Sequence, residues 1–143
     1  MTTARKPSLS ALLLGDYPND REVVRDVFVQ AGWQLFEAGE RRCALDHLEN
    51  DLVHVVIARA DLPGWNWKRL LFEIDRLVLP PQLIVTSPQA DERLWSEALN
   101  LGAYDVLAQP FDRDELERVV AAARRHFDTA PLRFRRSISI GAA

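Results

Sequence analysis

Cysteine is almost absent from this sequence of 143 residues, which contains only Cys43. A single cysteine excludes an internal disulfide, and with it the class of small secreted domains that disulfides hold together. The first eight residues, MTTARKPS, lack the apolar core of a signal peptide. No apolar run approaches the roughly 20 residues that cross a bilayer. We therefore expect a protein of the reducing cytoplasm without a membrane partner.

Histidine is also scarce, and the basic and acidic residues are nearly balanced. The three histidines, His47, His54 and His126, are scattered without the spacing of metal ligands. The 18 basic and 21 acidic residues give a formal net charge of -3, with no strongly basic stretch to attract a phosphate backbone. These features predict no metal, no cofactor and no nucleic-acid partner.

The residues that are abundant are apolar, at 48% of the chain, which is enough for one domain with its own core. Short apolar runs alternate with segments whose apolar residues repeat at helical spacing. The runs predict strands at 9–14, 33–37, 52–58, 82–86 and 104–108. The first predicted helix follows a cap at Asn19 or Asp20 and ends before Gly32. Further helices are predicted at 40–50, 67–77, 91–101 and 112–127.

Five strand–helix units with short connections predict a doubly wound α/β fold, in which a parallel sheet is covered on both faces. The site of such a fold lies beyond the carboxyl ends of the strands. The residues expected there are Gly15, Asp16, Arg59, Ser87 and Gln109.

Four segments carry a family resemblance in their order and spacing: ALLLGDYPND (11–20), VVIARADLPG (55–64), LIVTSPQADE (83–92) and LGAYDVLAQPFDRDEL (101–116). Across residues 9–127 the sequence resembles the receiver domains of bacterial two-component response regulators. The resemblance implies a flavodoxin-like sandwich of three layers whose five strands lie in the order 2-1-3-4-5. Residues 1–8 are then an N-terminal extension, and residues 128–143 a C-terminal tail expected to be flexible. The alternative is a strand at 137–140, where the residues alternate, that docks on a sheet edge or a partner.

The sequence departs from that family at its phosphorylation site. Two adjacent acids, which help to bind magnesium in the family, correspond here to Gly15 and Asp16. The phosphoacceptor aspartate, four residues before the turn proline, corresponds to Arg59. Because Asp16 and Arg59 balance each other without a metal, we expect a metal-free pocket closed by an ion pair between them.

Other positions of the site follow from the same resemblance. The hydroxyl that contacts the phosphoryl group corresponds to Ser87, and the family's lysine corresponds to Gln109, followed by Pro110 in a bond expected to be cis. The aromatic switch residue corresponds to Val106. For Ser87 a second role stays open, because serine hydroxyls often cap loops.

A surface for a partner is predicted from exposed apolar candidates. Trp65 and Trp67 flank the pocket, Trp95 and Leu99 lie one helical turn apart, and Val106 belongs to the fifth strand. Packing in the core is the competing interpretation for Trp65, Trp67, Trp95 and Leu99.

The functional hypothesis is a non-enzymatic, phosphorylation-independent module that binds another signalling protein: a kinase, a regulator or an output protein. A homodimer is left open. Two alternatives also remain. A two-residue shift of register would make Asp61 a conventional phosphoacceptor, and this fold also places small ligands at its strand ends, although no glycine-rich loop follows the first strand.

Overall fold

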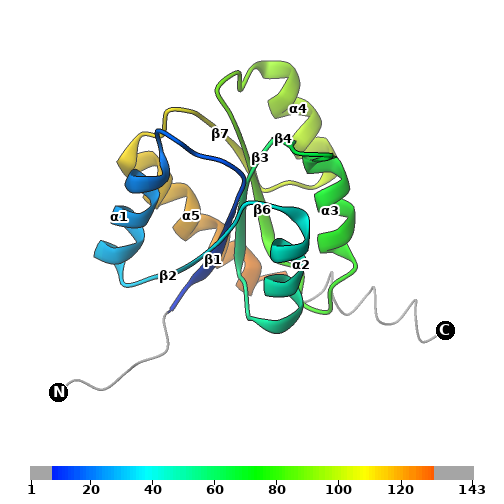
Figure 1. The fold of residues 1–143 in the computed structure, drawn as a ribbon, viewed down its shortest axis with the longest axis horizontal. Coiled ribbons are helices and arrows are strands. Elements are labelled where there is room, and N and C mark those ends of the chain that lie inside the picture. The colour runs from blue at the N-terminus through cyan, green and yellow to red at the C-terminus, as the bar shows by residue number, and fades with distance from the viewer. Residues whose placement is uncertain (1–7, 131–143) are drawn as a thin grey trace.

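A computed structural model describes residues 8–130, which form a five-stranded parallel sheet between two layers of helices (Figure 1). The strands are β1 (Ser10–Leu14), β2 (Gln34–Ala38), β3 (Val55–Arg59), β6 (Gln82–Ser87) and β7 (Asp105–Ala108). Their order across the sheet is β2-β1-β3-β6-β7, which confirms the predicted doubly wound topology.

The helices are α1 (Arg21–Ala31), α2 (Arg41–Asn50), α3 (Trp67–Asp75), α4 (Glu92–Leu101) and α5 (Arg113–Asp128). Helices α1 and α5 cover one face of the sheet, and α2, α3 and α4 cover the other (Figure 1). No helix within residues 8–130 is long and apolar enough to span a membrane. The strand-like pattern at 137–140 lies outside the described residues.

The side chains of the central strands alternate between the two faces. In β3, Val55 and Ile57 belong to the core beneath α1 and α5, whereas Val56 and Ala58 belong to the core beneath α2, α3 and α4. The period of two in a strand continues this alternation to its end. The side chain of Arg59 therefore lies on the face of the sheet that α1 and α5 cover.

A small hairpin was not predicted. Strands β4 (Asp61–Leu62) and β5 (Trp65–Asn66) pair in antiparallel fashion around Pro63 and Gly64. Each strand has two residues, too few for a pattern of hydrophobicity to show. Asn66 then caps α3 by accepting a hydrogen bond from the backbone N–H of Arg69 at 3.0 Å.

Two boundary predictions were wrong by more than one residue. The third strand begins at Val55 instead of residue 52, and Leu52 is exposed. The third helix ends at Asp75 instead of residue 77.

Candidate functional site

A pocket of about 380 Å³ lies at the carboxyl edge of the sheet. The loops after β1, β6 and β7 contribute to it, together with the last residue of β3. Its lining consists of Pro18, Asn19, Asp20, Arg59, Pro88, Gln109 and Pro110. The structure thus places Arg59 and Gln109 together, as predicted from the topology of the fold. Pro110, expected from the family resemblance, lies with them.

A chain of hydrogen bonds crosses this edge of the sheet. Asp20, which is buried, accepts from the Gln109 side-chain Nε2 and from the Phe111 backbone N–H, each at 3.1 Å. The Gln109 Oε1 accepts from the Thr86 hydroxyl at 3.2 Å. The Thr86 hydroxyl also lies 2.8 Å from the Tyr17 hydroxyl. The four side chains therefore tie together the loops that follow β1 and β7 and the end of β6.

Asp20 had been predicted as a possible cap of α1. It does occupy the N-cap position, but its side chain makes no capping hydrogen bond. Both carboxylate oxygens instead bind the segment that follows β7. Sequence reasoning missed this role because the partners lie 89 and 91 positions away.

Tyr17, in the loop after β1, is fully buried. Burial raises the pKa of its phenol well above the usual value, while the hydrogen bond with Thr86 and the positive charge of Arg59 act in the opposite direction. The Arg59 guanidinium carbon lies 5.9 Å from the centre of the Tyr17 ring, in the range of a cation–π contact.

The predicted ion pair between Arg59 and Asp16 is absent. Arg59 Nη1 instead donates a long hydrogen bond, 3.4 Å, to the backbone carbonyl oxygen of Asp16. The Asp16 carboxylate is 87% exposed, and its nearest charged neighbour is Arg21, at 4.0 Å. The prediction failed because the chain turns after β1 so that the Asp16 carbonyl, and not its side chain, meets Arg59.

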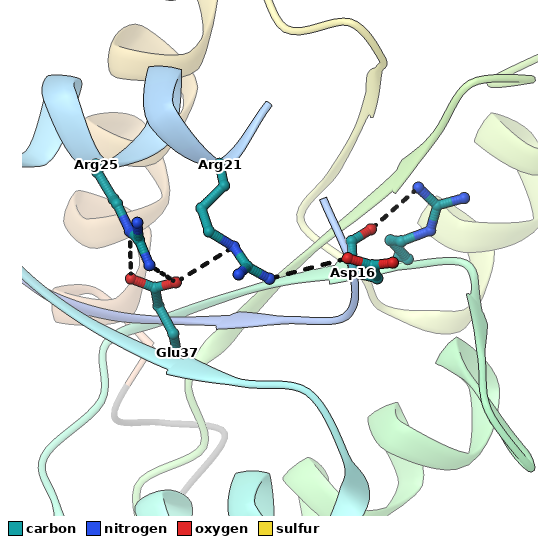
Figure 2. Close-up of polar contacts among 5 residues, drawn as sticks. Asp16, Arg21, Arg25 and Glu37 are labelled. Atoms are coloured by element: carbon teal, nitrogen blue, oxygen red, sulfur yellow. Dashed lines mark hydrogen bonds and ion pairs between the residues drawn. The ribbon is translucent and has the colours of Figure 1, made fainter. Parts of the chain in front are cut away.

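Figure 2 shows the Asp16 carboxylate at the end of a row of charges on α1 and β2. Arg21 lies between Asp16 and Glu37, with its Nε 3.5 Å from a Glu37 oxygen. Arg25 binds both oxygens of Glu37, at 2.8 and 3.0 Å. The carboxylate of Asp16 is thus associated with α1 instead of the pocket.

Gly15 and Arg59 are in close contact. Gly15 has a φ of 123°, a conformation that strongly favours glycine. A Cβ atom at this position would lie 3.2 Å from Arg59 Cγ and 3.3 Å from its Cδ. The absence of a side chain at residue 15 therefore makes room for the aliphatic stem of Arg59.

Comparison with known proteins settles the family, since the model of the response regulator receiver domain matches residues 11–121. The chain belongs to this receiver domain family.

Three relatives illustrate the similarity. Over 113 residues the receiver domain is 31% identical to the transcriptional regulatory protein CrdR of Helicobacter pylori, covering 78% of this chain and 51% of CrdR. It is 26% identical over 109 residues to the sporulation initiation phosphotransferase F of Bacillus subtilis, covering 76% and 88% of the two chains.

The third relative is a solved structure, the signal receiver domain of an HD domain-containing protein from Pseudomonas fluorescens Pf-5. It has a TM-score of 0.74 and 25% identity, and the match covers 87% of this chain and 99% of that one. The chain spans about half the length of CrdR. The similarity therefore supports a role for this receiver domain in two-component signalling.

The hydroxyl on the Arg59 face of the sheet belongs to Thr86, which contacts Gln109, so the assignment of Ser87 was wrong. Arg59 pairs with Thr86 in the register of β3 and β6, and Thr86 follows Ile84 on the α1 and α5 face. Ser87 points to the other face of the sheet. Its hydroxyl accepts a hydrogen bond from the Gln89 backbone N–H at 3.0 Å, which confirms the alternative role as a loop cap.

The Gln109–Pro110 peptide bond is cis, as predicted. The side-chain amide of Gln109 has hydrogen bonds at both ends, donating to Asp20 and accepting from Thr86. These two partners fix the orientation of the amide.

The magnesium ion that the family implies does not fit the side chains found here. Hard cations prefer several oxygen ligands, with carboxylates foremost. Asp16 turns its carboxylate outward, Gly15 supplies none, and the guanidinium of Arg59 brings a positive charge to the place where a cation would bind. Asp20 is engaged through both of its oxygens.

Asp61, the alternative phosphoacceptor, lies elsewhere. It is exposed on β4, opposite Asn66, and lines a different depression beside α3 and α4. The pocket formed by the strand ends includes Arg59 but not Asp61.

The predicted partner surface is only partly exposed. Trp67 is buried in the core, so core packing is its role. Trp65 is half-buried, with the Arg41 guanidinium 5.5 Å from its ring centre. Leu99 and Val106 are also half-buried, whereas Trp95 is 50% exposed on α4. Of the five candidates, Trp95 is the one most available to a partner.

Proposed function

We propose that this receiver domain serves two-component signalling by binding another protein without being phosphorylated itself. The observation that carries the proposal is the position of Arg59. It ends β3 and lines the pocket at the strand ends, and the proposal takes it to correspond to the family's phosphoacceptor aspartate.

Chemistry supports this proposal. An acyl phosphate forms when a carboxylate oxygen attacks phosphorus, and a guanidinium group has neither that oxygen nor an accessible deprotonated form. The nearby carboxylates are unsuited to replace it. Asp16 faces α1 and solvent, and Asp20 is buried with both oxygens bound to the segment after β7.

The partner is proposed to be a kinase, a regulator or an output protein, met in the cytoplasm. Trp95 supports a contact through α4, because a large exposed indole is a common anchor of protein interfaces. Enzymatic activity is not part of the proposal, in keeping with the general role of receiver domains as signalling modules.

Intact-mass spectrometry after incubation with acetyl phosphate and magnesium tests the proposal. We expect no increase in mass, while a phosphorylatable receiver domain treated in parallel gains a phosphoryl group. Asp61→Asn and Asp20→Asn are the variants that locate any modification. A phosphate-sized increase that is lost in Asp61→Asn would establish the conventional phosphoacceptor instead.

A further inference from the structure

The guanidinium of Arg59 has unused binding capacity in the pocket. Within residues 8–130 it forms no ion pair with a carboxylate, and its one hydrogen bond is the 3.4 Å contact from Nη1 to the Asp16 carbonyl oxygen. The remaining N–H groups of the fork are therefore available to an acceptor. A charged group with open donors at the strand ends of a doubly wound fold stands where such folds place ligands.

The pocket also has a fixed frame around this cation. Of the lining residues, Asp20 and Gln109 are joined by a hydrogen bond of 3.1 Å, and Gln109 is also held by the buried Thr86 hydroxyl at 3.2 Å, so the polar wall is already formed. Three of the seven lining residues are prolines, namely Pro18, Pro88 and Pro110. Proline rings are rigid and apolar, which suits contact with a hydrocarbon group. The volume of about 380 Å³ lies within the range of small-molecule sites.

We propose that this pocket binds a carboxylate that carries an apolar body, with the carboxylate on Arg59 and the body against the prolines. The planar fork of a guanidinium matches the two oxygens of a carboxylate. The compound is a small organic acid or the acidic side chain of a protein, which present the same group.

A phosphate is the poorer ligand here for two reasons. Phosphate sites usually depend on backbone N–H groups, and the three prolines of the lining have none. A phosphate also brings more negative charge than a carboxylate, next to a single cation and the buried carboxylate of Asp20. One negative charge is the better complement.

Titration calorimetry of the full chain tests this proposal with benzoate as the small acid and N-acetylglutamate amide as the model of a protein side chain. Benzamide, which has the same ring without the charge, and inorganic phosphate are the comparison ligands. We expect one of the two carboxylates to bind more tightly than benzamide and phosphate. The carboxylate that binds more tightly indicates whether the pocket takes a small organic acid or the acidic side chain of a protein.

Variants then assign the binding to Arg59. Arg59→Gln should weaken carboxylate binding about tenfold or more, because it removes a charge-assisted hydrogen bond. Arg76→Gln, an exposed arginine at the end of α3, is the matched control and should bind as the wild type does. In NMR spectra of the wild type, the side-chain amide signals of Gln109 should shift on addition of the carboxylate.

Four results would refute the proposal. Neither carboxylate binds; neither binds more tightly than benzamide and phosphate; binding of the tighter carboxylate is unchanged in Arg59→Gln; or that binding leaves the Gln109 signals in place. The inference rests on the proposed function in one respect: both assign Arg59 a role as a positive charge in place of a phosphoacceptor. Its failure would leave the mass measurement unaffected, so the two can fail separately.

Discussion

The carboxylate of Asp20 lies 3.1 Å from the side-chain amide nitrogen of Gln109, 89 positions further along the chain. This contact, with that from the Phe111 backbone, joins the loop after β1 to the loop after β7. The side chains of this pocket do not suit a metal ion, and these hydrogen bonds hold two sides of the pocket together.

Asp20→Ala should lower the free energy of unfolding by about 1–3 kcal/mol, because it leaves the Gln109 amide and the Phe111 N–H without their acceptor in a buried place. Urea denaturation measures the change. Asp46→Ala, an exposed acid on α2, is the control and should change stability by no more than about 0.5 kcal/mol. Equal effects of the two substitutions would show that the Asp20 network contributes little.

Gly15→Ala should destabilise the fold for two separable reasons, a strained φ and a contact with Arg59. Gly102→Ala is the matched control, because its φ of 113° is similar but an added Cβ would meet nothing within 4 Å. We expect the backbone strain to lower the free energy of unfolding by about 1–2 kcal/mol at either glycine. The total loss should be larger at Gly15. Thermal or urea denaturation gives both values.

The additional loss of stability at Gly15, compared with Gly102, should become smaller when Arg59 is replaced by alanine. The Cγ and Cδ atoms that crowd the new Cβ are then absent. A double-mutant cycle with Arg59→Ala measures this. Additive effects would mean that the Arg59 stem moves aside without loss.

Above about pH 10 the protein should lose stability as the pH rises, and Tyr17 is one reason. Burial raises the pKa of Tyr17 in the folded state above its ordinary value of 10.0. The unfolded chain therefore releases this proton first, and the folded state becomes less favourable by up to about 1.4 kcal/mol per pH unit. Urea denaturation between pH 8 and about pH 11 measures the slope, which should be smaller in Tyr17→Phe. An identical slope would show that Tyr17 is not responsible.

His54 should produce a loss of stability on the acid side. It is buried, and its Nδ1 accepts a hydrogen bond from the Ser10 backbone N–H at 3.0 Å. Burial, with a smaller effect from Arg124, lowers the pKa of His54 in the folded state, whereas Asp128 opposes the shift. The unfolded chain then binds a proton first, so this contribution is present above about pH 6.5 and is lost below it.

Urea denaturation at pH 7 and pH 5 compares the wild type with His54→Asn, in which the acid-induced loss should be smaller. His126→Asn changes an exposed histidine of α5 and should retain the loss seen in the wild type. If His54→Asn and wild type respond alike to acid, another group causes the change.

The sequence predicted the sheet and its site edge because these depend on local pattern and on the rules of connection. Buried runs such as 9–14 and 82–86 marked the strands, and the five-unit alternation implied the topology. The choice between Thr86 and Ser87 could also have been made, since alternation from Ile84 places Thr86 on the face of Arg59.

The details of the pocket could not be predicted in the same way. The role of Asp20 depends on partners about 90 positions away, which no local periodicity reveals. The Arg59–Asp16 prediction treated charge as the only consideration, whereas the path of the chain after Gly15 determines which atoms of Asp16 come near Arg59. Tyr17 was overlooked because an aromatic residue beside a turn gives no indication of burial.

The close approach of Gly15 and Arg59 determines the better order in which aspartates could be introduced at these two positions. An aspartate placed first at residue 15 would meet the arginine stem at 3.2–3.3 Å and a φ that side chains rarely adopt. An aspartate placed first at residue 59 would remove that contact, so that only the strained φ would remain for the second substitution. Engineering that begins at position 59 therefore avoids the contact between the new side chain and the arginine stem, whereas the reverse order begins with it.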